Sequence, residues 1–329
     1  MSGARKGCFP HMRDLLRRII LWGGLALLCV LPPLADALGE GFYTVMVSRV
    51  LILALGAVSL NLILGYGGMV SFGHAAYLGI GAYVVGILSY HSGEWFGTES
   101  AFIAFPAAML VSALFALVTG AISLRTSGVY FIMITLAFAQ MVYFFFVSQQ
   151  EYGGMDGMQM WARSAAGPLD LSDDASFYYL ALVLLLAVLF LKYRLVHSRF
   201  GLVLRGIREN ERRMKALGFA TYRYKLVAFV LSGMVAGLAG AMMANLTEFV
   251  SPSLLHWTRS GELMVMVILG GMGSIAGPVL GAFAFLVLED VLAEITQHWM
   301  IVLGPLLILI VLLARRGLYG LLTPEGRSK

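Results

Sequence analysis

Charge is scarce in this sequence. Of its 329 residues only 12% are charged while 60% are hydrophobic, whereas a soluble globular domain carries about 25% charged residues. That scarcity excludes water as the main solvent of the folded chain. Apolar runs of about 20 residues, enough to cross a hydrocarbon core about 30 Å thick, follow one another from Ile19 to Ala314. The composition therefore predicts a protein that crosses a membrane several times.

Cysteine is also scarce, and the motifs of nucleotide-binding and hydrolytic enzymes are lacking. Cys8 lies in a basic amino-terminal tail and Cys29 in an apolar run, so we expect neither a disulfide nor a metal site. The six histidines are scattered without the spacing of metal ligands, and no G-x-x-x-x-G-K-[ST] or G-x-S-x-G motif occurs. We therefore predict no catalytic residues, no metal, no cofactor bound by this chain and no enzymatic activity.

The apolar runs predict an all-α fold. A spanning β-barrel would show alternating polarity over segments of about 10 residues, but stretches such as 180–191 are apolar throughout. We expect a polytopic transmembrane helical bundle of about ten hydrophobic segments, in a single transmembrane domain over 1–329. The expected segments are 15–34, 43–66, 75–90, 102–124, 129–147, 177–191, 226–246, 262–269, 279–288 and 300–314. The segments 262–269 and 279–288 are too short to cross a membrane alone.

The basic residues gather in three regions of the chain. Nineteen of the 23 lysines and arginines lie at the amino-terminal end up to Arg18, between Lys192 and Lys225, or after Ala314. By the positive-inside rule these regions are cytoplasmic, so both termini are predicted inside. This orientation accounts for the net charge of +5, and we expect membrane lipid rather than nucleic acid beside the basic surface. The remaining arginines fit span ends or loops, where their side chains are expected to snorkel toward water: Arg49, Arg125, Arg163 and Arg259.

A short glycine motif occurs twice. GGMVSF at 67–72 recurs as GGMGSI at 270–275, and both copies interrupt a hydrophobic stretch. Paired interruptions are typical of a transport path, because broken helices expose backbone dipoles at membrane depth only where protein or water covers them. Chance is the alternative in a chain with 38 glycines. The candidate path residues in the two copies are Gly67, Gly68, Ser71, Gly270, Gly271 and Ser274.

Polar side chains beside and within the apolar segments have two interpretations. Ser71 and His74 border the first copy of the motif, where they brace unwound backbone, which we favour, or bond a substrate. Asn61, Thr135 and Gln140 are typical of interhelical hydrogen bonds in membranes. For Gln140 a place on the transport path is the alternative.

The longest hydrophilic stretch on the expected inner side, 194–225, predicts an amphipathic helix at the membrane surface. Its apolar residues share one stripe at helical spacing: Leu204, Ile207, Met214 and Leu217. Two favourable i,i+4 charge pairs lie in it: Glu209 with Arg213, and Glu211 with Lys215. Gly218 is expected to end this helix. Such a helix transmits motion from a soluble ATPase or rests on anionic headgroups, and composition alone favours the second.

Three segments carry a resemblance to a known family: GYGGMVSFGHAAYLGIGAY at 65–83, RFGLVLRGIRENERRMKALGF at 199–219, and ILGGMGSIAGPVLGA at 268–282. In sequence and order they resemble the hallmark segments of LivM-type permeases of ABC importers for branched-chain amino acids. The resemblance extends over residues 43–322. It implies a heteromeric importer in the bacterial inner membrane, with a second homologous permease, two cytoplasmic ATPase subunits on which ATP acts, and a periplasmic binding protein that delivers substrate.

The resemblance also changes the interpretation of the hydrophilic stretch. It implies that 192–225 is a cytoplasmic coupling loop, with ATPase docking at Arg205, Arg208, Glu209, Asn210 and Gly218. The sequence departs from the family at 212–215, which is more basic than usual, and at 159–161, where a Gly-Ile-Pro turn is common.

Other functions remain as alternatives at this point. Permeases of urea or short-amide importers resemble the same segments. An ion-coupled secondary transporter commonly needs ionisable residues at membrane depth, which the apolar segments nearly lack. A membrane-embedded enzyme would need clustered His, Asp or Glu, and no such cluster is evident in the sequence.

Overall fold

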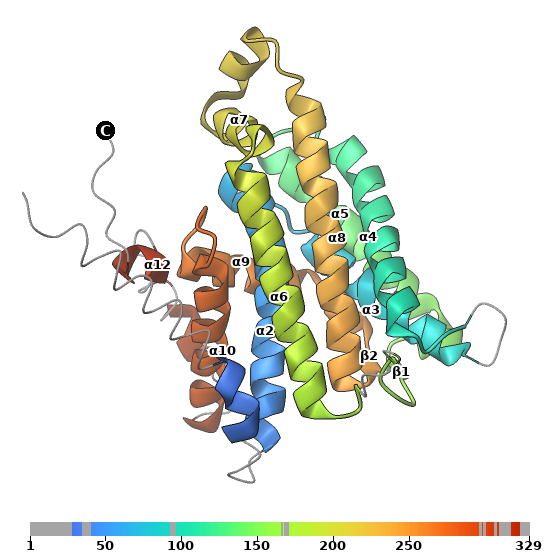
Figure 1. Ribbon diagram of the computed structural model, residues 1–329. Helices are drawn as coiled ribbons and strands as arrows, with labels where there is room; N and C mark the ends of the chain where they lie inside the picture. The colour runs from blue at the N-terminus through green and yellow to red at the C-terminus, as the bar shows by residue number, and fades with distance from the viewer. Residues whose placement is uncertain are drawn as a thin grey trace, which may run out of the picture.

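The protein is an all-α bundle in a computed structural model that describes residues 28–34, 41–92, 97–165, 167, 171–295, 298, 301–305, 308 and 317–322. Its helices are α2 (Gly41–Asn61), α3 (His74–Tyr90), α4 (Ala101–Ser123), α5 (Val129–Ser148), α6 (Asp174–His197), α7 (Arg199–Ala216), α8 (Thr221–Thr247), α9 (Trp257–Gly270), α10 (Gly277–Ile295) and α12 (Gly317–Leu322). Short elements connect them: the π-helical turn η1 (Leu62–Tyr66), the 3-10 turns η2 (Gln150–Tyr152) and η3 (Pro252–Leu255), and the antiparallel strands β1 (Met158–Gln159) and β2 (Phe249–Val250). Figure 1 shows α7 at one end of the bundle and the two strands near the other.

Five of the described helices are long and apolar enough to cross a membrane: α2 with η1, α4, α5, α6 and α8. The apolar helix α3, with 17 residues, is shorter. Each of the six coincides with an apolar segment expected from the sequence, which confirms the polytopic helical bundle. The expected segments 15–34 and 300–314 lie largely outside the described residues.

The two segments expected to be short differ from each other. α9 has 14 residues, about 21 Å at 1.5 Å per residue, and remains too short to span. α10 has 19 residues, about 28 Å, and is longer than the apolar segment predicted at 279–288. It is not among the described helices that are long and apolar enough to span. Glu289 and Asp290 end the apolar run there, but the helix continues to Ile295, and Arg49 of α2 lies 3.5 Å from the Glu289 carboxylate.

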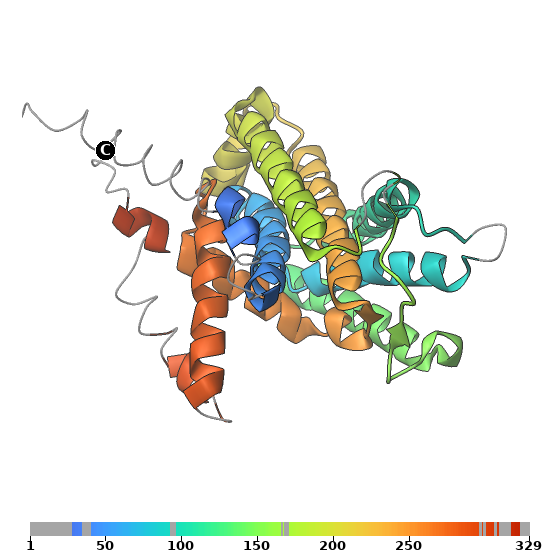
Figure 2. The ribbon, with the colours of Figure 1, turned by 60° about the horizontal axis from the view of Figure 1, so that its bottom comes forward.

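α2 is the centre of the bundle. Its apolar window is 94% buried, because α6, α8, α9 and α10 all pack around it (Figure 2). Only 22% of the corresponding window of α5 is buried. A helix enclosed on every side is apolar all round, as α2 is, whereas α5 leaves much of its apolar surface for lipid or another subunit.

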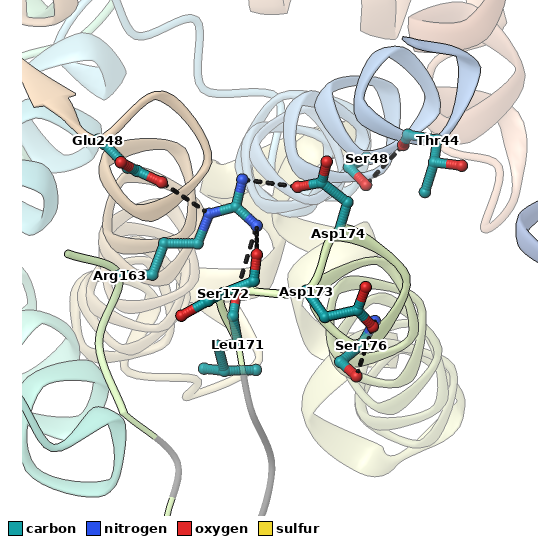
Figure 3. A network of polar contacts seen from close by, with 9 residues as sticks. All are labelled: Thr44, Ser48, Arg163, Leu171, Ser172, Asp173, Asp174, Ser176 and Glu248. Atoms are coloured by element: carbon teal, nitrogen blue, oxygen red, sulfur yellow. Dashed lines mark hydrogen bonds and ion pairs between the residues drawn. The ribbon is translucent and has the colours of Figure 1, made fainter. Parts of the chain in front are cut away.

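Arg163 joins the start of α6 to the end of α8 (Figure 3), at the end of α6 that lies away from α7. Its guanidinium lies 2.7 Å from the carboxylate of Asp174, at the start of α6, and 3.3 Å from that of Glu248, just after α8. It also donates to the Leu171 carbonyl at 3.2 Å and lies 5.2 Å from the ring centre of Phe177. The side chain is 9% exposed. The prediction that it snorkels toward water was wrong, because two carboxylates from separate helices compensate its burial.

Candidate functional site

The chain leaves helical geometry at both copies of the glycine motif. The first glycine break, residues 67–73, separates η1 from α3, and the second glycine break, residues 271–276, separates α9 from α10. Gly67 opens the first break, and Gly270 is the last residue of α9. Gly68, Gly271 and Gly273 have positive φ angles of 68°, 113° and 78°, which glycine adopts at little cost. The helix interruptions predicted from the repeated motif are confirmed.

Asn61 joins the second glycine break to the helix that leads into the first. Its Nδ2 donates to the Ser274 carbonyl at 2.7 Å, and its Oδ1 accepts from the Gly273 N–H at 3.0 Å. Gly65 allows the approach, since a Cβ there would lie 2.5 Å from the backbone nitrogen of Gly273. The fully buried amide therefore makes the interhelical bonds expected of it, and it brings segments 213 residues apart into contact.

Arg208 of α7 reaches the same place from the end of the bundle. Its Nη1 donates to the Gly65 carbonyl. A Cβ added to Gly68 would lie 2.9 Å from the Arg208 Cγ, and one added to Gly273 would lie 3.5 Å from its Nη1. One side chain thus bonds α7 to the turn that leads into the first glycine break, and it lies close to glycines of both breaks. We call this contact region the glycine junction: Asn61, Gly65, Arg208, Gly273 and Ser274.

Ser71 and His74 are buried inside the bundle beside the first break. The His74 Nε2 lies 2.8 Å from the Ser232 Oγ, which itself donates to the Ser59 carbonyl at 2.6 Å. The Ser71 Oγ accepts from the Gly73 N–H at 3.2 Å. These bonds hold backbone and neighbouring helices in place, which is what a bracing role requires.

Other polar side chains around the first break were only partly foreseen. The Ser260 Oγ of α9 accepts from the Ala75 N–H at 2.8 Å and donates to the Phe72 carbonyl at 2.7 Å. Thr135 of α5, expected to join helices, accepts from the Phe72 N–H at 3.3 Å. No pattern pointed to Ser260, because single serines are ordinary in apolar helices. Gln140 makes none of these contacts, and its buried Nε2 has no hydrogen-bond partner among the described residues.

The coupling loop is not the single helix that its pattern predicts. Residues 192–197 continue α6, and Asn210 interrupts α7 with φ −156° and ψ 97°. The Asn210 side chain accepts from the Arg213 N–H at 2.9 Å, as an N-cap does, so a second helical part begins there. The predicted pair of Glu209 with Arg213 was wrong: the kink takes Glu209 out of register, and no ion pair joins these two described side chains.

The apolar stripe of the loop is interrupted at the same kink. Leu204 and Ile207 are buried, whereas Leu217, beyond the kink, is 64% exposed. Arg205 donates to the carbonyls of Val196 at 3.2 Å and Gly201 at 3.4 Å, which closes the corner between α6 and α7. The first part of α7 therefore packs on the bundle, while the second part projects from its end (Figure 1).

Glu211 ties the projecting part of α7 to α8. Its carboxylate pairs with Lys215 at 3.0 Å, as predicted, and with Lys225 of α8. Burial raises the pKa of Glu211, but the hydrogen bonds and charges of Lys225 and Lys215 outweigh it and leave the pKa below its ordinary value of 4.5. The predicted stop is confirmed at Gly218, whose φ is 86° and whose N–H donates to the Lys215 carbonyl at 3.0 Å.

A cavity of about 320 Å³ lies beside the glycine junction. Residues 67–70 of the first break line it, together with the turn after α4 and the side chains of Arg208, Glu211 and Lys225. Backbone that is not helical is tolerated at membrane depth only where protein or water covers it. The charged groups on this wall let water reach the first break, so its carbonyls and amides need not face lipid.

Comparison with known proteins assigns the chain to a family. Residues 43–312 match the family described as "Branched-chain amino acid transport system / permease component". The high-affinity branched-chain amino acid transport system permease protein LivM of Salmonella typhimurium is 29% identical over 329 residues, which cover 93% of this chain and 76% of that protein. The protein of the same name from Escherichia coli is 30% identical over 303 residues, covering 85% and 69%.

A more distant relative is the probable branched-chain amino acid transport permease protein LivH of Methanocaldococcus jannaschii, 26% identical over 145 residues that cover 41% of this chain and 43% of that protein. No solved structure matches the chain. The relatives are transport permeases and not enzymes. With its apolar helices, two glycine breaks and an extended match, the chain belongs to the permease family of branched-chain amino acid transport systems, as a multi-pass inner-membrane protein of the LivM type.

Proposed function

We propose that this chain moves branched-chain amino acids across the inner membrane as a permease subunit, driven by ATP hydrolysis on partner subunits. In this proposal a periplasmic binding protein delivers the substrate, a second homologous permease completes the path, and two ATPase subunits act on α7. The observation that carries it is the bond from Arg208 of α7 to the Gly65 carbonyl, with Gly68 and Gly273 of the two glycine breaks close to the same side chain. The names of the relatives support the substrate class.

The geometry of α7 suits a part that transmits motion. Glu211 bonds Lys215 within α7 and Lys225 in α8, so the projecting part moves together with the start of α8. The first part of α7 carries Arg208, whose guanidinium bonds a backbone carbonyl at the glycine junction. A displacement of α7 therefore changes one charge-to-carbonyl contact and the spacing of two segments that already lack helical bonds. Such a rearrangement costs little compared with breaking a regular helix.

The proposal places the α7 end of the bundle in the cytoplasm, with both termini on that side and the whole chain as one transmembrane domain. The basic residues between Lys192 and Lys225 support this orientation. Glu209 and Asn210 are exposed at the kink, where they are available to an ATPase subunit. Gly218 ends the projecting part of α7. In this proposal 192–225 is the cytoplasmic coupling loop, on which the ATPase subunits act.

The test is Arg208→Ala in the importer purified with its partner subunits. We expect normal membrane insertion and normal co-purification of the ATPases, because the side chain bonds within this chain. Substrate-stimulated ATP hydrolysis and uptake are expected to fall about tenfold or more, because the variant lacks the charge-assisted hydrogen bond that joins α7 to the glycine junction. Arg194→Ala, an exposed arginine on α6, is the matched control and should retain coupling.

Wild-type uptake per assembled complex in Arg208→Ala would refute the proposed transmission through the glycine junction. Loss of ATPase co-purification in Arg208→Ala but not in Arg194→Ala would instead place Arg208 at the subunit interface. Uptake per assembled complex and co-purification of the ATPases are measured on the same purified samples.

A further inference from the structure

A second polar cavity lies at the amino-terminal end of α9, the end opposite the second glycine break. Its volume is about 330 Å³, within the range of about 300 to 1,000 Å³ that small-molecule sites occupy. Four parts of the chain line it: α5 through Tyr143, the loop before β1 through Met155, the turn from Ser251 to Ser253, and the start of α9 with Arg259 and Glu262. The glycine junction uses none of these residues.

Arg259 and Glu262 give this cavity two opposite charges. The Arg259 Nη1 lies 2.8 Å from the Glu262 Oε2, and the side chains are 34% and 35% exposed. Charged groups are costly against lipid and are placed beside water, polar groups or other protein surface instead. The pair lies on the cavity wall, so the face formed by α5 and α9 is suited to a polar path rather than to lipid contact.

The neighbouring charges form an ion pair of their own, so Arg259 and Glu262 are available to bind a ligand. Arg49 of α2 and Glu289 of α10 pair with each other at 3.5 Å. Among the described residues, Glu262 is the carboxylate that pairs with Arg259. A guanidinium has five N–H donors and a carboxylate about four acceptor sites, so both groups have bonding capacity beyond their mutual contact.

The rest of the wall is ordered and partly apolar. The His256 Nδ1 lies 2.9 Å from the Thr258 Oγ1, and the rings of His256 and Tyr143 meet edge to face with centres 5.4 Å apart. Pro252 and Met155 also line the cavity. A ligand with two opposite charges at one end and an aliphatic group at the other matches this wall.

We infer that the cavity binds the zwitterionic end of an aliphatic α-amino acid, its carboxylate at Arg259 and its ammonium at Glu262, with the side chain against Tyr143 and Pro252. A zwitterion satisfies both charges without leaving a net charge buried, which a monovalent ion cannot do. This assignment rests on the proposed function and names the residues that recognise its substrate inside the permease. α5 is the least buried of the five candidate spanning helices. Its exposed face therefore leaves room for a second permease subunit to pack against α5 and cover the cavity.

The test uses the complete importer in proteoliposomes, with leucine-loaded binding protein at saturating concentration. Arg259→Gln and Glu262→Gln are each expected to lower leucine uptake about tenfold or more, with the yield of assembled complex unchanged. The exchange of both charges, Arg259→Glu with Glu262→Arg, keeps an ion pair on the helix but reverses its direction. Uptake in the exchanged variant is expected to stay low. Gly261→Ala is the control on the same turn, because a Cβ there meets nothing within 4 Å.

A labelling measurement does not depend on the stability of the charge variants. In a chain with Cys8 and Cys29 replaced by serine, Ser253→Cys places a thiol at the exposed edge of the cavity. Its reaction with a thiol reagent is expected to be slower with leucine-loaded than with unloaded binding protein. Equal rates would overturn the assignment.

Two further outcomes separate this inference from the proposed function. Wild-type uptake in the exchanged variant or in both single variants would show that the pair does not recognise the substrate. That result would overturn this inference but not the proposed function. Absence of leucine uptake by the unaltered importer would refute the proposed function, and this inference with it.

Discussion

Two arginines, one near each end of the bundle, are held in different ways. Arg163 is 9% exposed and pairs with the carboxylates of Asp174 and Glu248, which belong to the ends of two spanning helices. Arg208 bonds the carbonyl of Gly65, and none of the described carboxylates pairs with it. The end with Arg163 is fastened by opposite charges, whereas the end with Arg208 is held by one charge and a backbone dipole.

The difference indicates which end is built to move. Removing one partner of a buried ion pair is costly, because the remaining charge loses its compensation. A guanidinium that leaves a carbonyl near a water-accessible cavity regains much of that bond from water. We therefore expect α6 and α8 to stay fixed relative to each other beside Arg163, while α7 and the two glycine breaks shift.

The largest expected effect on stability is that of Arg163→Met. The change removes two ion pairs, a bond to the Leu171 carbonyl and the contact with Phe177. Asp174 and Glu248 are 44% and 45% exposed, so solvent screening limits the loss to about 2 to 3 kcal/mol. Thermal unfolding in detergent measures it, with Arg194→Met as the control. ATP hydrolysis per assembled complex should remain stimulated by substrate.

A melting temperature equal to that of Arg194→Met would contradict the interpretation that the ion pairs of Arg163 stabilise its end of the bundle. Uncoupled hydrolysis in well-folded Arg163→Met would contradict the comparison itself, because the fixed end would then take part in transmission.

Two buried asparagines, one at the glycine junction and one near Arg163, allow the two ends of the bundle to be compared by the same substitution. Asn61→Leu leaves the Gly273 N–H and the Ser274 carbonyl unpaired at the glycine junction, and Asn245→Leu leaves the Ser164 N–H unpaired near the Arg163 end. Each change should destabilise the protein by about 1 to 3 kcal/mol, the cost of orphaned buried polar groups. Uptake per assembled complex should fall in Asn61→Leu alone. Equal uptake in the two variants would separate Asn61 from transport.

The smallest expected effect is the pH dependence at Glu211. Its pKa in the folded protein lies below the ordinary value of 4.5, so its contribution to stability is fully present above that value and is lost as the pH falls through the lowered pKa. The difference in melting temperature between wild type and Glu211→Gln should therefore be constant above about pH 5.5 and shrink below it. A difference that grows as the pH falls would contradict the bonds to Lys215 and Lys225.

Part of the functional region follows from local pattern, and part does not. The repeated glycine motif located both helix breaks, and Gly218 located the end of α7. The same reasoning predicted a regular helix through Asn210 and a pair of Glu209 with Arg213, and both were wrong. Asparagine is only mildly unfavourable in a helix, so propensity alone does not identify the position at which its side chain instead caps a second helical part.

By itself the sequence determined the solvent and the position of most helices, because long apolar runs without charge are stable only as helices in lipid. The repeated glycine motif marked two helix breaks, although α8 continues through Gly233, Gly237 and Gly240. Only the tertiary structure decided which groups meet. Arg208 bonds a carbonyl 143 residues away and Asn61 one that is 213 residues away. Hydropathy and helical spacing are local properties, whereas a polar group in a membrane bonds whichever partner the packing of distant helices brings within reach.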